Sequence, residues 1–349
     1  MKQEQEEASE EITEVAPGVL RLQLPLHLPG LHHVNCYALV DGDGVALVDP
    51  GHWGKEYWTA LGSRLASAGL PIERVHTVVI SHSHGDHFGG TTWLNDHAKP
   101  KVVTHAAFST GFEDPNHVCT DPTHDHNVDR SEQEHVVDFH EPTPWGSEGM
   151  TARDLSLKQR WRMRKIKRFR SSMRPPHPHR RVRDGEAIRL AGRDWFVRHT
   201  PGHTVDHICL HDPEHGVLLS GDHVLPSITP HISGLSTTDD PLAAFFESLR
   251  GVAALGIQTV LPAHGHPFGD LPGRVEGIIQ HHQGRLDQLQ TISHDLGWAS
   301  VTDISHELFA QRSWGRMAES EAYAHLEHLR LLGRAERRGE GAALQYLVP

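Results

Sequence analysis

The chain has 349 residues, 37% of them hydrophobic, and a formal net charge of −12. This length fits one large catalytic domain with a small appended one, while no apolar run reaches the ~18 residues of a membrane span. The acidity argues against generic nucleic-acid binding, and three distant cysteines, Cys36, Cys119 and Cys209, argue against a disulfide framework or cysteine zinc site. Residues 1–13 are acidic and lack a secretory signal, so we expect a disordered tail and a cytoplasmic protein.

Short apolar runs bounded by turn residues predict two groups of strands. They cover residues 19–24, 36–40, 45–49, 75–80 and 101–104, and then 185–190, 194–199, 207–210, 216–219 and 259–261. Helices are predicted over residues 55–68, from residue 89 onward, and over residues 239–256. Residues from about 108 to 181 are rich in Pro, Asp, His and Arg and weakly periodic, which indicates a long insertion and favours a lid.

The chain becomes helical again from residue 284. Helices are predicted over residues 286–293, 301–310 and 318–332, and two strands over residues 335–338 and 343–348. Three helices followed by a two-stranded wing form a winged-helix pattern. We therefore predict a catalytic domain over residues 14–282 and a winged-helix domain over residues 284–349.

Four potential metal ligands directly follow the strand predicted over residues 75–80. Within the segment His82-x-His84-x-Asp86-His87, side-chain alternation places His82 and His84 on one side, where they can hold one ion. Asp86 and His87 lie beyond a turn at Gly85 and can face a second ion. A chain with 32 histidines contains accidental clusters, so the spacing carries this prediction and the number of histidines does not.

Three further candidate ligands each follow a predicted strand. His203 lies in Thr-Pro-Gly-His-Thr, Asp222 in Ser-Gly-Asp-His, and His264 in Pro-Ala-His-Gly. Ligand-binding groups of α/β sheets collect at the carboxyl ends of strands. We therefore expect these side chains to meet the His82–His87 segment at one edge of the fold.

With Asp49 after an early strand, these motifs resemble in kind and order those of the metallo-β-lactamase superfamily, across roughly residues 14–282. The resemblance implies an α/β fold, a four-layer αββα sandwich with a two-metal site on one edge. It implies that the first ion is held by His82, His84 and His203, the second by Asp86, His87 and His264, with Asp222 bridging and Asp49 orienting ligands by hydrogen bonds.

Differences within the superfamily narrow this resemblance. At the position of Asp222, antibiotic-cleaving members often have Cys. Glyoxalase II, lactonases and RNA-processing nucleases have Asp there, as this chain does. His84 stands where diiron flavoproteins have Glu. Two zinc ions suit a His-rich site, and iron or manganese are alternatives. Persulfide dioxygenases, which bind one iron, share much of the pattern.

Two dications can share a hydroxide that attacks the substrate, with Asp86 orienting it and Asp222 contacting both ions. We therefore predict a binuclear zinc-dependent hydrolase acting on a thioester, ester or lactone, although the ligand set alone does not choose between carbon and phosphorus esters. One alternative is an endoribonuclease or phosphodiesterase that cuts single-stranded RNA. Another is a winged-helix nucleic-acid-binding regulator with an inert metal domain.

A basic segment within the insertion bears on the substrate. Residues 153–183 contain 13 Lys and Arg against one acid, Asp154. Its densest part contains Arg162, Arg164, Lys165, Lys167, Arg168 and Arg170. Such a segment is either a solvated helix face or a recognition patch for an anionic substrate. We expect a small anionic acyl substrate and no membrane partner, and nucleic acid is the alternative partner. The C-terminal helices are expected to serve in packing or homodimerisation.

Overall fold

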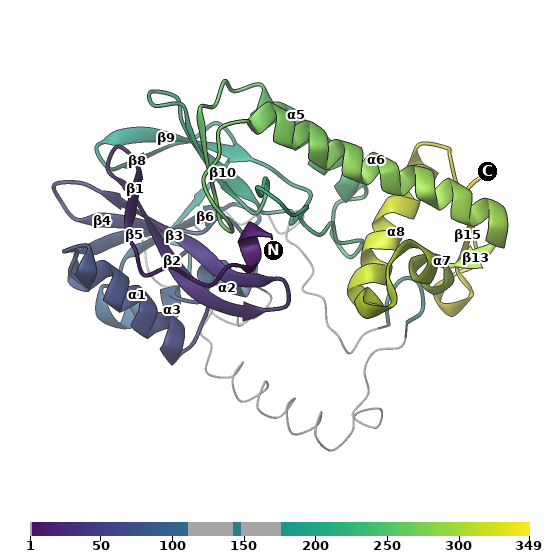
Figure 1. Cartoon of the computed structure of the whole chain (residues 1–349), viewed down its shortest axis with the longest axis horizontal. Coiled ribbons are helices and arrows are strands. Elements are labelled where there is room, and N and C mark those ends of the chain that lie inside the picture. Colours follow the sequence, from purple (N-terminus) through teal and green to yellow (C-terminus); the bar gives the residue numbers. More distant parts are fainter. Residues whose placement is uncertain (1, 111–141, 148–175) are drawn as a thin grey trace, which may run out of the picture.

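Two β-sheets lie face to face between layers of helices (Figure 1). The computed structural model describes residues 2–110, 142–147 and 176–349. The first sheet runs in the order β1 to β7: β1 (Thr13–Ala16), β2 (Val19–Leu28), β3 (Leu31–Val40), β4 (Val45–Val48), β5 (Val75–Val79), β6 (Lys101–His105) and β7 (Arg180–Val182). The second runs in the order β12 to β8: β12 (Thr259–Pro262), β11 (Val217–Gly221), β10 (Ile208–Asp212), β9 (Arg193–His199) and β8 (Ala187–Leu190).

Alternation of apolar side chains explains how one sheet packs on both of its faces. In β4, Ala46 and Val48 face the second sheet and join the inter-sheet core around Trp195. Val45 and Leu47 point the other way, into a core shared with helix α1 (Lys55–Ser67). A strand buried on both faces is uniformly apolar, as parallel strands covered by helices usually are. The result is the αββα layering that the resemblance to the metallo-β-lactamase superfamily implies.

The parallel strands bring their carboxyl ends to one edge of the sandwich. β4, β5, β6 and β7 pair parallel in the first sheet, and β11 and β12 pair parallel in the second. Their connections run through α1, through α2 (Gly85–Phe88) and α3 (Thr91–His97), and through α5 (Pro241–Ala253). The turns that follow β4, β5, β11 and β12 carry most of the candidate ligands, so topology alone gathers them.

Helix α6 (Leu271–Leu296) is far longer than the helix predicted over residues 286–293. It begins at Asp270, whose carboxylate accepts a hydrogen bond from the Gly273 amide at 2.9 Å. Its buried positions recur at helical spacing: Leu271, Val275, Ile278, His282, Leu286 and Leu289. Gly284, which we took as a boundary, is exposed on this helix and costs about 1 kcal/mol relative to Ala, which the continuous buried stripe offsets.

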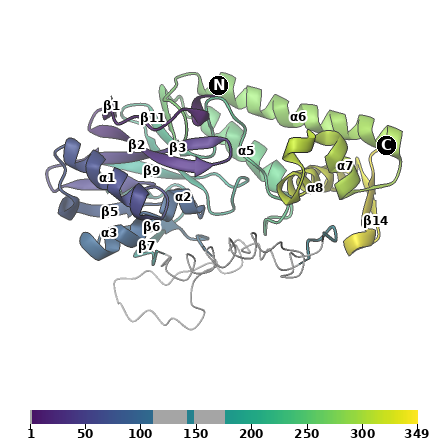
Figure 2. The ribbon, with the colours of Figure 1, turned by 60° about the horizontal axis from the view of Figure 1, so that its bottom comes forward.

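The chain beyond α6 forms two more helices and a small sheet at one end of the molecule (Figure 2). These are α7 (Val301–Leu308) and α8 (Arg316–Leu331), with a sheet in the order β13 (Ala299–Ser300), β15 (Gln345–Leu347) and β14 (Glu336–Arg338). α6 passes through the predicted boundary between residues 282 and 284, so one helix serves both parts of the chain. The division into two domains and the winged-helix assignment stay predictions.

The N-terminal residues are packed against the fold, where we expected a disordered tail. Residues Gln3–Gln5 form a turn of 3-10 helix, and Glu4 is completely buried. Its carboxylate accepts hydrogen bonds from the amides of Ser227 and Ile228, at 2.8 and 3.1 Å, and from the Ser227 hydroxyl. A carboxylate with three donors can be buried at tolerable cost, which an acidic composition alone does not reveal.

Most of the predicted insertion, including the six basic residues from Arg162 to Arg170, lies outside the described residues. Within the described ranges, none of the helices combines the length and apolar character that crossing a bilayer requires.

Replacing Glu4 with Ala tests whether the N-terminal turn contributes to stability. The change leaves the amides of Ser227 and Ile228 without their acceptor, which we expect to lower the free energy of unfolding by about 1–3 kcal/mol. Chemical denaturation would measure the loss. The matched control is Glu11→Ala, because Glu11 is exposed in the same segment. Equal stability of the two variants would contradict the prediction.

Candidate metal centre

The turn after β5 carries four of the candidate ligands. His82 and His84 lie in the bends that follow the strand, and Asp86 and His87 lie in the single turn of α2. The backbone changes from extended at His84 to helical from Gly85, and the ring of His87 lies 4.1 Å from that of His82. His82, Asp86 and His87 are buried, whereas part of His84 is exposed at the rim while its Nδ1 is packed against the rings of His82 and His203.

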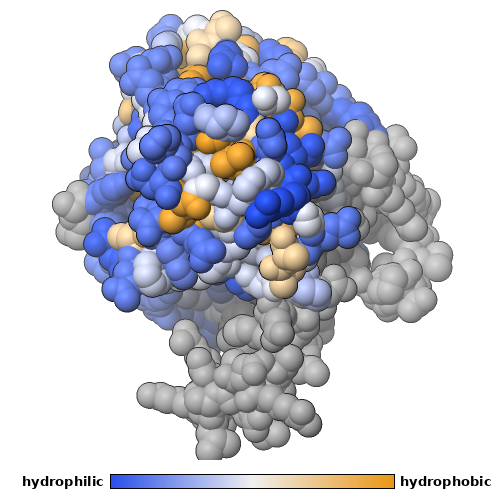
Figure 3. All heavy atoms as spheres, turned by 90° about the vertical axis from the view of Figure 1, so that its right-hand side faces the viewer, coloured by the Kyte–Doolittle hydropathy of each residue, from blue (hydrophilic) through white to orange (hydrophobic). Residues whose placement is uncertain are grey.

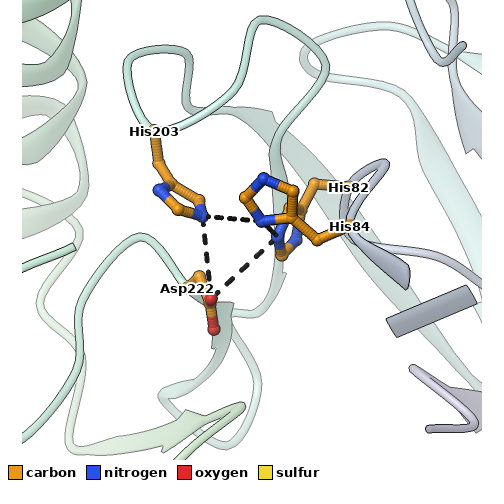
Figure 4. Close-up of side chains that lie close together, drawn as sticks. All are labelled: His82, His84, His203 and Asp222. Atoms are coloured by element: carbon orange, nitrogen blue, oxygen red, sulfur yellow. Dashed lines mark hydrogen bonds and ion pairs between the residues drawn. The ribbon is translucent and has the colours of Figure 1, made fainter. Parts of the chain in front are cut away.

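His82, His84, His203 and Asp222 form the first group of candidate ligands (Figure 4). His84 Nδ1 lies 2.9 Å from His82 Nε2 and 3.1 Å from His203 Nε2. Asp222 Oδ2 lies 3.6 Å from His203 Nε2 and 4.0 Å from His82 Nε2. Ligand nitrogens of a tetrahedral zinc site, with bonds of about 2.0–2.1 Å, lie roughly 3.3 Å apart. The spacings of this group are therefore of the right size for one ion.

Asp86, His87 and His264 form a second group beside the first. Asp86 Oδ2 lies 3.7 Å from His87 Nε2 and 3.6 Å from His264 Nε2. Asp222 again borders the group, with Oδ2 3.7 Å from His87 Nε2 and Oδ1 3.3 Å from His264 Nε2. The structure thus brings all seven predicted ligands together and places the Asp222 carboxylate between the two groups.

The hydrogen-bond inventory supports a cation between these groups. His87 Nε2, His264 Nε2 and Asp222 Oδ1 are buried atoms with no hydrogen-bond partner. Buried polar atoms are rarely left unpaired, and these three face one another across the centre. With Asp49, the centre contains three carboxylates and no Lys or Arg among its ligands, so dications would compensate the buried negative charge. The donor set of imidazole and carboxylate fits zinc-like metals.

Electrostatics keeps the histidines of the first group in the form that binds metal. Burial, followed by neighbouring histidines, lowers the pKa of His82 well below its usual value and that of His84 to about 3. Burial also lowers the pKa of His203, although Asp222 partly opposes it. These rings are therefore neutral near pH 7, with a free lone pair.

The carboxylates have the opposite effect around His87. Burial lowers the pKa of His87, but Asp222, Asp86 and Asp49 outweigh it and raise that pKa well above the usual value. Burial raises the pKa of Asp222, but His264 and His87 outweigh it and hold that pKa well below its usual range. The second group therefore attracts positive charge to the place where its ligand atoms converge.

Hydrogen bonds behind the rings aim their other nitrogens at the centre. His87 Nδ1 donates to Asp49 at 2.9 Å, and Asp49 also accepts from the Ser81 amide and hydroxyl at 2.8 and 2.7 Å. His264 Nδ1 donates to the His33 carbonyl at 2.6 Å, and His203 Nδ1 to the His231 carbonyl at 2.8 Å. Such partners fix the tautomer and orientation of a ligating imidazole.

Sequence reasoning missed His207, which holds the backbone of Asp222. The Asp222 amide donates to His207 Nε2 at 3.0 Å, and His207 Nδ1 lies 2.7 Å from the Thr200 hydroxyl. Gly221 adopts a φ of +51°, and a Cβ there would lie 2.6 Å from His207 Nε2. The available signal was a histidine four residues after His203, which was inconspicuous among 32 histidines.

Comparison with known proteins agrees with this geometry. The family model described as the metallo-beta-lactamase superfamily matches residues 29–264. A metallo-beta-lactamase family protein of Thermus thermophilus has a similar structure, with a TM-score of 0.74 and 28% identity, over 96% of this chain and 100% of that one. A beta-lactamase domain protein of Burkholderia ambifaria gives a TM-score of 0.72 and 26% identity, over 98% and 96% of the two chains.

Curated relatives include lactamase-like proteins of several fungi. The lactamase-like protein vrtG of Penicillium aethiopicum is 27% identical over 284 residues, which span 80% of this chain and 67% of vrtG. The lactamase-like protein nscB of Trichophyton rubrum is 43% identical over 104 residues, which span 30% of each chain. The family match covers more than half of the chain, and the candidate ligand histidines and aspartates of this chain converge as described above. This chain is a member of the metallo-beta-lactamase superfamily.

Proposed function

We propose that this protein is a binuclear metal-dependent hydrolase that binds two zinc ions and acts on a thioester, ester or lactone. The observation that carries the proposal is the Asp222 carboxylate, which lies within 4.0 Å of ring nitrogens from both ligand groups. His82, His84 and His203 would hold one ion, Asp86, His87 and His264 the other, and Asp222 would contact both. When bound, two dications polarise the scissile carbonyl group and lower the pKa of a water molecule toward about 7.

The protein's own groups prepare this chemistry. Neutral imidazoles in the first group offer lone pairs, and the ionised Asp86 and Asp222 offer acceptor oxygens that orient a water molecule beside them. Burial excludes bulk water and strengthens each of these interactions. Asp49 and the carbonyls of His33 and His231 limit the rotation of the rings. No separate nucleophilic side chain is required.

Endoribonuclease activity is the second candidate, and the basic segment of residues 153–183 favours it. The acidic side chains of α8 are engaged within the protein. Glu319 accepts from Trp145 at 2.9 Å, and Glu327 accepts from Arg330 at 2.8 Å. These contacts support a packing role for the C-terminal helices.

The C-terminal end bears on the predicted homodimer. Its exposed large apolar residues are Leu296, Trp314, Met317, Leu331 and Leu332. On the face shown in Figure 3, apolar patches are separated by hydrophilic side chains. A stable homodimer interface is usually larger and more continuously apolar than these separated patches. The homodimer therefore stays a prediction.

A turnover panel on the zinc-loaded protein tests the substrate class. We expect hydrolysis of an acyl thioester, an ester or a lactone, and little cleavage of β-lactams or single-stranded RNA. The measurement is the kcat/KM for each substrate, with metal-free protein as the control. A kcat/KM highest for single-stranded RNA would replace the acyl hydrolase with the endoribonuclease.

Elemental analysis of the purified protein tests the two-ion assignment. Seven ligands in two adjacent groups predict close to two metal ions per chain, with zinc favoured by the imidazole-rich donor set. A fully active preparation with at most one ion per chain would contradict this assignment.

Asp222→Ala should reduce activity more than any single histidine substitution, because it removes the one side chain that borders both groups. We expect the loss of at least one ion and a fall in turnover of about a hundredfold or more, since loss of even an outer partner costs about 10–100-fold. Exposed His97 provides the control His97→Ala, which should leave both values unchanged. Wild-type metal content in Asp222→Ala would disprove the bridging role.

Neutralising Arg162, Arg164, Lys165 and Lys167 tests the basic segment. If it binds an anionic substrate, the KM for that substrate should rise at low salt, and the effect should shrink near 0.15 M, where the screening length is about 8 Å. Turnover of an uncharged lactone or ester should stay the same. An equal fall in kcat for charged and uncharged substrates would assign the segment a structural role.

A further inference from the structure

Helix α8 of the C-terminal region reaches the metal centre through the loop after β11. His203, from the first ligand group, donates from Nδ1 to the backbone carbonyl of His231 in that loop, at 2.8 Å. The ring of His231 in turn places Nδ1 3.3 Å from Glu321 Oε2 on α8. Two contacts therefore connect a candidate metal ligand to a helix whose sequence lies about a hundred residues further along the chain.

The charge state of these groups fits a directed hydrogen bond. Burial, followed by the charge of Arg285, lowers the pKa of His231 to about 4, so its ring is neutral near pH 7. With Glu321 as a carboxylate, His231 Nδ1 carries the proton and donates it. Arg285 on α6 forms an ion pair with the other oxygen of Glu321. One carboxylate thus joins α6, α8 and the loop that supports His203.

Glu321 also belongs to a third group of metal-compatible side chains, with His282 and His325. Arg285 already supplies a positive charge to this carboxylate. His325 Nδ1 donates to the Glu321 carbonyl at 2.7 Å, which leaves Nε2 to accept from His282 Nδ1 at 3.0 Å. The ion pair with Arg285 thus engages the Glu321 carboxylate, and hydrogen bonds engage both His325 nitrogens and His282 Nδ1, while His282 Nε2 is buried without a hydrogen-bond partner.

A second contact fixes the same loop to the same helix. The hydroxyl of Ser320 accepts a hydrogen bond from the Gly234 amide at 3.0 Å and lies 3.3 Å from the Ser233 hydroxyl. A Cβ at Gly234 would lie 2.6 Å from the Ser320 carbonyl oxygen, so only glycine permits this approach. Two successive residues of α8, Ser320 and Glu321, thus contact the loop on either side of Ile232.

We infer that α8 forms part of the support of the metal centre and that Glu321 is a positioning residue for His203. Glu321 holds the His231 ring, and the His231 carbonyl then orients the His203 ring. The inference rests on the proposed function, because it concerns the ion that His203 would hold. It assigns the C-terminal region a role in metal binding that requires no nucleic acid and no second copy of the chain.

Zinc titration of metal-free protein, in competition with a chromophoric chelator, tests the inference. Glu321→Gln keeps the shape of the side chain but removes the charge that pairs with Arg285 and attracts the His231 donor. Substituting a direct outer partner costs about 10–100-fold in metal affinity, so we expect about tenfold weaker binding of one ion at this further remove. The affected ion should be the one whose binding is abolished by His203→Ala, with the other ion unchanged.

A control and a double variant separate positioning from general destabilisation. Glu327→Gln lies on the same helix, where Glu327 pairs with Arg330, Arg337 and Tyr346, and it should leave both zinc affinities unchanged. In a His231→Ala background, Glu321→Gln should have no further effect on the first ion, because the ring that connects Glu321 to His203 is absent.

Three results would overturn the inference: wild-type affinity in Glu321→Gln, equal weakening in Glu327→Gln, or an undiminished effect in the His231→Ala background. A wild-type protein that binds fewer than two ions would instead refute the proposed function, so the two failures can be distinguished.

Discussion

The structure depends on burying three carboxylates, Asp49, Asp86 and Asp222, within one edge of a sandwich. A buried charge without compensation costs several kcal/mol, so each carboxylate must find donors or cations. Asp49 finds them in Ser81 and His87. Asp222 finds only a ring of histidines, and one of its oxygens has no hydrogen-bond partner. That imbalance makes the centre attractive to metal ions, and the carbonyls of His33 and His231 hold two of the ligand histidines in place.

The candidate ligands could be predicted from sequence because each directly follows a strand. In α/β sheets, ligand-binding residues collect at the carboxyl ends of the strands. His82, His203 and His264 could therefore be assigned to one edge without knowledge of any contact. The αββα layer order came instead from the resemblance to the metallo-β-lactamase superfamily, and the apolar run Val45–Val48 agrees with it because that strand is buried on both faces. Local pattern and the general rules of sheet topology were enough only for the gathering of the ligands at one edge.

Apart from Asp49, which the family resemblance implied, the supporting groups could not be predicted, because they are defined by contacts between distant segments. The carbonyls of His33 and His231 orient ligands, yet a carbonyl has no signature in the sequence. The full length of α6 was missed, because the periodicity that carries this helix through Gly284 comes from burial against partners far along the chain. The acidic N-terminal residues were expected to be disordered from their composition. The hydrogen-bond donors that hold Glu4 belong to residues 227 and 228, and this long-range contact has no signature in the N-terminal sequence.

The continuity of α6 has a consequence for how this chain can be divided. At a rise of about 1.5 Å per residue, its 26 residues make a rod of roughly 39 Å. Leu271 and Val275 at its start pack in the same apolar cluster as Leu329 and Tyr346 of the C-terminal end. A shuffled or truncated gene that ended near residue 282 would leave half a helix with an uncovered apolar stripe. The two parts of the chain are therefore not interchangeable modules, and inheritance should keep them together as one unit.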